Sequence, residues 1–112
     1  DLGLTSEYND IVKVDDGYIA VGSVLMDEKS KEDNLTEAVI VKYDNNFNIV
    51  WRKNLNILDT SKFNKVKVDK AGNYVVVGTS VYAPNIIGNH TTGGAIIVKY
   101  DKNGEIFISS LL

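Results

Sequence analysis

The same sequence pattern occurs twice in this chain. "AVIVKYDNNFNIVW" at 38–51 returns as "AIIVKYDKNGEIFI" at 95–108, and "GYIAVGS" at 17–23 returns as "NYVVVGTS" at 73–80. Upstream, "TSEYNDIVKVDDG" from Thr5 corresponds to "TSKFNKVKVDKAG" from Thr60, so the repeat covers almost all of the 112 residues. Self-similarity at a period of about 56 residues is typical of solenoids, propellers and repeat arrays. We therefore predict one module, 1–112, made of two repeats at about 5–56 and 60–112.

Each repeat contains four short runs rich in Val, Ile and Tyr, separated by Asp, Asn and Gly. This composition is typical of strands joined by tight turns, and tight turns make antiparallel neighbours. No window has apolar residues at helical spacing, so the sequence predicts an all-β chain. The expected strands are 8–14, 18–24, 38–43 and 49–55 in the first repeat, and 63–68, 74–82, 95–100 and 105–111 in the second.

The four runs of a repeat differ in how they alternate. The second and third runs carry apolar residues on both alternations, as in Ile19-Ala20-Val21, which predicts a strand covered on both faces. The first run alternates Val with Lys, and the fourth carries Trp51 followed by polar residues, as an edge strand does. A four-stranded sheet with a buried middle and a polar outer strand, repeated in tandem, is the pattern of a β-propeller blade.

The pattern also resembles a known repeat. "YNDIVKVDDGYIAVGS" and "EAVIVKYDNNFNIVW" resemble the blades of bacterial cell-surface and secreted β-propellers. The resemblance covers both repeats and implies two four-stranded antiparallel blades, and an extracellular or cell-surface location in a bacterium. One departure is Phe47, which stands where the second repeat has the turn glycine Gly104. Such blades serve adhesion, scaffolding, carbohydrate binding and catalysis, so the resemblance does not select one function.

Two blades do not close a ring, because propellers have roughly four to eight. Each blade offers a face of roughly 400 Å², and covering a wholly apolar face of that size contributes at most on the order of 10 kcal/mol. We expect other copies of the chain, in a homo-oligomer, or the remaining blades of a longer chain to complete the ring. The abrupt start at Asp1-Leu2-Gly3 favours a piece of a longer protein.

The long connections predict where a ligand binds. In an up-down meander successive connections alternate ends, so 25–37, 56–62 and 83–94 share one rim, and loops on a rigid scaffold commonly carry function. The alternative is that these loops are tolerated insertions. A lone loop histidine is most often solvated, and the acidic residues of 25–37 are interspersed with lysines, so no metal and no cofactor is predicted. The predicted ligand-binding residues on this rim are Asp27, Glu28, Asn34, Tyr82, Asn89, His90 and Thr91.

Composition and missing motifs restrict the function further. A net charge of −3 and scattered lysines predict no nucleic-acid binding, and no apolar run is long enough for membrane insertion. With no cysteine and no nucleophile-elbow, zinc-protease or phosphate-loop motif, we predict no catalytic residues, although a propeller enzyme fragment that needs absent blades stays open. The leading hypothesis is a non-enzymatic structural or interaction module with a protein or glycan ligand. The alternative is an oligomeric carbohydrate-binding lectin with sites on the long-loop rim. Trp51 could stack on a sugar ring, but packing against the next blade or lying on the sheet edge is the favoured role.

Overall fold

The fold consists of strands and turns. The computed structural model describes residues 5–25, 35–58, 60–81 and 93–111. These residues form β1 (Thr5–Val14), β2 (Gly17–Leu25), β3 (Glu37–Asp44), β4 (Ile49–Leu55), β5 (Thr60–Val68), β6 (Tyr74–Val81), β7 (Gly93–Tyr100) and β8 (Ile106–Leu111). The all-β prediction is confirmed, with every predicted strand present. Within the described ranges, no helix has the length and apolar character needed to cross a membrane.

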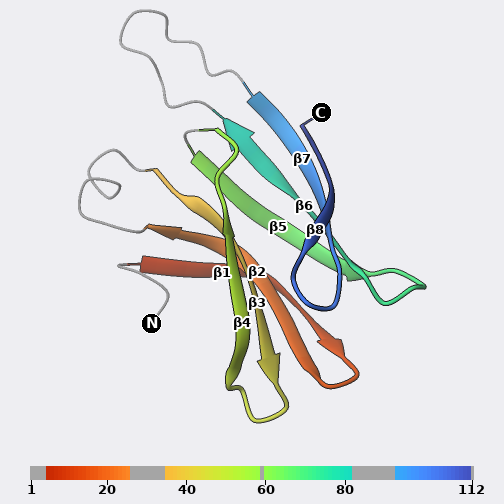
Figure 1. The fold of residues 1–112 in the computed structure, drawn as a ribbon. Coiled ribbons are helices and arrows are strands. Elements are labelled where there is room, and N and C mark those ends of the chain that lie inside the picture. The colour runs from red at the N-terminus through yellow and green to blue at the C-terminus, as the bar shows by residue number, and fades with distance from the viewer. Residues whose placement is uncertain (1–4, 26–34, 59, 82–92, 112) are drawn as a thin grey trace, which may run out of the picture.

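The strands form two antiparallel meanders, one from each sequence repeat. The first sheet has the order β1-β2-β3-β4 and the second the order β5-β6-β7-β8, so within each sheet every strand pairs with its neighbours in sequence (Figure 1). β1 and β5 each contain a bulge at the same place in the repeat, after Tyr8 and after Phe63. Because the registers match from strand to strand, each position in the first sheet has an equivalent in the second.

Three of the tight turns share one geometry. The carbonyl oxygens of Asp44, Asp69 and Asp101 accept hydrogen bonds from the amides three residues later, at 3.0 Å in each turn. The residue that donates this bond has a positive φ in all three turns, 65° at Phe47, 85° at Gly72 and 82° at Gly104. Glycine reaches this conformation without strain, whereas a bulky residue does not, so Phe47 is an exception within a repeated turn.

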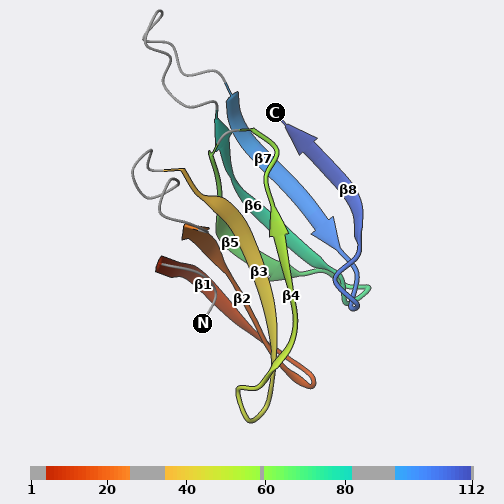
Figure 2. The same cartoon turned by 60° about the vertical axis from the view of Figure 1, so that its left-hand side comes forward.

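The two sheets stack as successive layers (Figure 2). Side chains alternate between the two sides of a strand, and we call one side face A and the other face B. Face B of the first sheet packs on face A of the second, and β5 lies against β1, β2 and β3. Face A carries Val39 and Val41 in the first sheet, and the equivalent Ile96 and Val98 in the second. Face B carries Ile19, Val21 and Ile40 in the first sheet, and the equivalent Val75, Val77 and Ile97 in the second.

The shared core lies between the layers. It combines side chains from β2 and β3 with side chains from β5, β6 and β7, and the partly buried Trp51 and Leu55 of β4 pack against it. Burial of this apolar surface between the sheets is the main force that holds them together. The buried members of the core are Ile19, Val21, Ala38, Ile40, Phe63, Val66, Tyr74, Val76, Ile96, Val98 and Tyr100.

The centre of face A of the first sheet is covered by side chains of the same sheet. Val39 and Val41 on this face are fully buried. They form a small cluster with Val24 against which Tyr43 packs, and the Tyr43 hydroxyl is 2.6 Å from that of Tyr8. The side chains of this face are small enough for longer ones on the same sheet to lie over them. The first sheet therefore covers much of this face by itself.

Candidate functional site

The predicted rim residues are not among those that the structure describes. Asp27, Glu28, Asn34, Tyr82, Asn89, His90 and Thr91 all lie outside the described residues, so the long-loop rim stays a prediction. The described residues present two other candidate surfaces. One is a cleft where the two sheets meet at the rim of the tight turns, and the other is the uncovered face B of the second sheet.

Polar contacts along β5 fix how the two sheets meet. We call the contact between face B of the first sheet and face A of the second the joint. Near its middle, Asn9 Nδ2 donates to the carbonyl oxygen of Phe63 at 2.8 Å, and the Val66 amide donates to Asp10 Oδ2 at 3.0 Å. At the opposite end from the tight turns, the Ser61 amide donates to the Thr36 carbonyl oxygen at 2.9 Å. These directional bonds set the register between the layers, which apolar contact alone does not specify.

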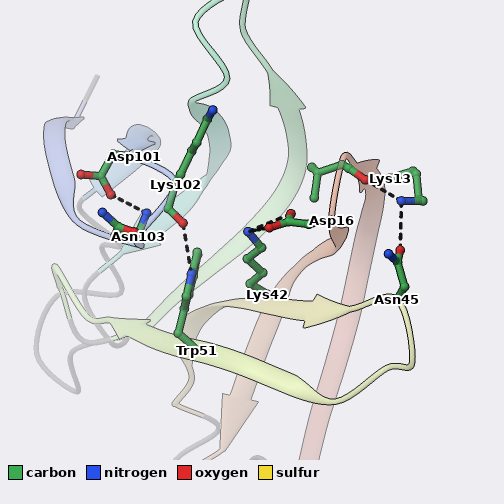
Figure 3. A network of polar contacts seen from close by, with 9 residues as sticks. Lys13, Asp16, Lys42, Asn45, Trp51, Asp101, Lys102 and Asn103 are labelled. Carbon is green, nitrogen blue, oxygen red and sulfur yellow. Dashed lines mark hydrogen bonds and ion pairs between the residues drawn. The ribbon is translucent and has the colours of Figure 1, made fainter.

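Trp51 closes the joint at the tight-turn rim. It lies on face B of the first sheet, opposite Lys42, and its ring centroid is 6.3 Å from that of Tyr74 in the second sheet. The indole Nε1 donates to the Lys102 carbonyl oxygen at 3.3 Å (Figure 3). The ring lies directly over Gly104, where an added Cβ would be 3.0 Å from it. The prediction that Trp51 packs against the neighbouring repeat is confirmed.

Lys42 is the most buried cation of the described residues, with 7% of its surface exposed. Its ammonium reaches out of the joint to Asp16, with Nζ 3.0 Å from the carboxylate (Figure 3). This hydrogen bond holds the pKa of the Asp16 carboxyl below its ordinary value. The stem of Lys42 lies against the apolar joint while its charge reaches water and a counterion, as is usual for a half-buried lysine.

The equivalent lysine of the second sheet also pairs with an aspartate in the turn between the first two strands of its sheet. Lys99 Nζ is 2.8 Å from Asp69 Oδ2, and this contact is the main reason why the pKa of Asp69 falls to about 2. The lysine within the repeated "VKYD" segment is therefore a structural feature of both sheets. Because this lysine interrupts an otherwise apolar run, its structural role could have been predicted from the sequence.

Beside Lys42 the two sheets enclose an open cleft of about 490 Å³. Its lining comes from the turn after β1, the turn after β5 and the turn after β7, and it includes Lys13, Asp15, Asp16, Tyr74 and Lys102. Lysine ammonium groups and aspartate carboxylates can form charge-assisted hydrogen bonds with a small ionic or hydroxyl-rich molecule. In the described part of the chain, no three histidine, aspartate or glutamate side chains are grouped so that they could hold a metal ion.

Sequence reasoning did not find this cleft, because its residues come from both repeats and meet only when the sheets stack. The hydroxyl of Tyr74 points to the same region, and burial raises the pKa of that phenol. Comparison with known proteins adds no assignment for the cleft or for the fold. No protein-family model matches the chain, and no curated protein matches it in sequence.

Proposed function

We propose that the chain is a non-enzymatic structural and interaction module, consisting of two successive blades of a β-propeller like those of bacterial surface or secreted proteins. The observation that supports this proposal is the joint between unlike faces of two equivalent sheets. If the two equivalent sheets formed a closed sandwich, a two-fold axis would relate them, and the same face of each sheet would lie at the contact. Face B on face A is instead the relation between consecutive blades of a ring.

The role of such a module is to hold loops on a rigid support. The joint combines an apolar core with hydrogen bonds from Asn9 and to Asp10, so the two blades behave as one body. The long connections leave from the ends of β2 and β6, on the rim opposite the tight turns. A partner that contacts both connections would bind across two blades, on a surface of fixed geometry.

The blade assignment is tested by dividing the chain. Residues 1–58 and 60–112 are expected to be unfolded when they are produced separately, because each would expose the face that the joint buries, including Ile19, Val21 and Ile40 in the first. Far-UV circular dichroism and thermal melts measure this. A half that melts cooperatively on its own would contradict the assignment.

The non-enzymatic role would be refuted by turnover of a polysaccharide or peptide substrate that disappears in an Asp16→Asn variant.

The cleft between the blades favours a second candidate function, binding of an acidic saccharide. Lys42 comes from the first blade and Lys102 from the second, so a carboxylate bound between them would be held by both. A glycan array probed with wild type and with Lys102→Ala tests this function. The matched control is Lys70→Ala, which removes an exposed turn lysine outside the cleft lining. Binding that both variants retain, or no binding to acidic glycans, would exclude the cleft as the site.

A further inference from the structure

Among the described residues, no second layer covers face B of the second sheet, whereas the equivalent face of the first sheet is covered. Val77 is 38% exposed, whereas its equivalent Val21 is completely buried. Ile97 is half-buried, whereas its equivalent Ile40 is completely buried. The register of β6 and β7 places these residues on the same side as their equivalents in β2 and β3. The second sheet therefore presents a face with an apolar centre at Val77 and Ile97, flanked by the exposed Lys65 and Lys67 of β5. The copy of this face in the first sheet binds a neighbouring layer.

Face A of the first sheet is the counterpart that this surface would need. Tyr8 and Tyr43 form an edge-to-face ring pair with an interplanar angle of 90°, and the equivalent Phe63 and Tyr100 form the same pair at 86°. In the second sheet the pair is buried in the joint, with Phe63 completely covered, whereas Tyr8 is 40% exposed. The contact geometry used inside the chain is thus already present on the free face of the first sheet.

Ile11 extends the same surface. It is 56% exposed, while its equivalent Val66 is 5% exposed in the joint. This isoleucine and the neighbouring aromatic rings form an exposed apolar patch, and such patches commonly mark interaction sites.

We propose that face B of the second sheet binds face A of the first sheet of a second copy of this chain, so that copies associate head to tail. The contact repeats the joint inside the chain, and the inference rests on the blade assignment proposed above. One such joint buries roughly 800 Å² in total, which is small for a stable complex, whereas a closed ring of two copies has two joints and buries roughly 1,600 Å². Closure is therefore expected to be cooperative.

Apolar residues also occupy the equivalent positions at the tight-turn rim. Inside the chain, Trp51 fits over Gly104 because the glycine has no side chain. The equivalent positions in the proposed joint are Ile108 of one copy and Phe47 of the other. The proposed joint would therefore bring two apolar side chains together at this rim, where the joint inside the chain has an indole ring and a glycine.

The conformation of Phe47 supports the same contact. It is an aromatic residue at φ 65°, where the two equivalent turns have glycine, and this conformation is strained for a residue with a side chain. Its ring stacks on Tyr18 with centroids 5.0 Å apart and is otherwise largely exposed. Insertion beside Ile108 would bury this ring and offset the strain of the turn.

The polar bonds of the joint also have matching equivalents. Asn9 donates to the carbonyl of Phe63, and its equivalent Asn64 is placed to donate to the carbonyl of Tyr8 in the second copy. Asp10 accepts from the Val66 amide, and its equivalent is Lys65, which cannot accept. No acceptor is required there, because the Ile11 amide already donates to its own Asp10 Oδ1 at 3.0 Å.

Light scattering tests the assembly. Wild type is expected to have the mass of two or more chains of 12.3 kDa. Val77→Lys and Ile11→Lys are each expected to have the mass of one chain. Ile57→Lys makes the same chemical change at 36% exposure in the connector between β4 and β5, and is expected to keep the wild-type mass. Circular dichroism confirms that the variants fold. A wild type that stays at one chain's mass at high concentration would overturn the inference.

Cross-linking tests the polarity of the joint, since the chain has no cysteine of its own. Phe47→Cys and Ile108→Cys are expected not to cross-link when either is treated alone with a short bismaleimide. A mixture of the two is expected to give a covalent dimer. Dimers from one single variant alone would indicate a joint between like faces and overturn the proposal. If the separate halves stay unfolded while wild type is monomeric, the blade assignment survives and only the self-association fails.

Discussion

Gly104→Ala is expected to lower the free energy of unfolding by about 2–3 kcal/mol. About 1 kcal/mol comes from holding alanine at the φ of 82° that Gly104 adopts. The rest comes from overlap, because the new Cβ would lie 3.0 Å and 3.1 Å from two carbons of the Trp51 ring. That ring is held between the turn and Tyr74, so it cannot move away without loosening the joint.

The matched control is Gly72→Ala. Gly72 has nearly the same φ, 85°, but the nearest atom to its added Cβ belongs to the flexible side chain of Lys102. It should lose only about 1 kcal/mol, so the difference between the two variants measures the contact with Trp51.

Urea denaturation provides the measurement, followed by far-UV circular dichroism and by the fluorescence of Trp51, the single tryptophan of the chain. Thermal melts should show a decrease of roughly 4 °C for each kcal/mol. Equal losses in the two variants, or an unchanged Trp51 emission spectrum in Gly104→Ala, would refute the packing argument.

Three further predictions concern the sheets themselves. Tyr100→Phe is expected to raise the free energy of unfolding by about 1 kcal/mol, because the buried Tyr100 hydroxyl has no hydrogen-bond partner among the described residues; thermal melts check this, and a clear loss of stability would contradict it. Asp69→Asn is expected to flatten the acid dependence of the melting temperature. The hydrogen bond from Lys99 lowers the folded pKa of Asp69 from 3.8 to about 2, so its stabilisation is present above about pH 4 and is lost as the pH falls toward 2. Equal slopes for wild type and variant over that range would contradict this. Gly78→Ala is expected to destabilise by roughly 3 kcal/mol in urea denaturation, because a Cβ would overlap the Lys62 carbonyl across the β5 bulge, whereas Thr79→Ala in the same strand should cost far less.

The repeat was sufficient to predict the strands and their connections. Alternation and turn chemistry are local properties, so the runs around Val21 and Val41 and the turns after Asp44 and Asp101 could be recognised without any knowledge of the partner sheet. The role of Trp51 at the joint also followed from its place on the outer strand. The strands and the tight turns depend on residues that are close in sequence.

The sequence could not predict what covers each face. An apolar run such as Ile19-Ala20-Val21 predicts cover on both sides but does not say whether a second layer or the sheet's own side chains provide it. In the first sheet, the centre of face A at Val39 and Val41 is covered by residues of the same sheet, including Tyr43. The cleft was missed for a related reason, since Lys42 and Lys102 line it together only because the two repeats stack.

The joint between unlike faces also bears on how such a chain can grow in evolution. A contact between like faces ends once two units have met, because no copy of either surface is left free. A contact from face B to face A leaves one surface of each kind at the ends of the stack, and the β5 bonds of Asn9 and Asp10 give the contact a direction. Tandem duplication of the gene segment for one sheet would therefore add a layer that already fits its neighbour, with no newly evolved surface.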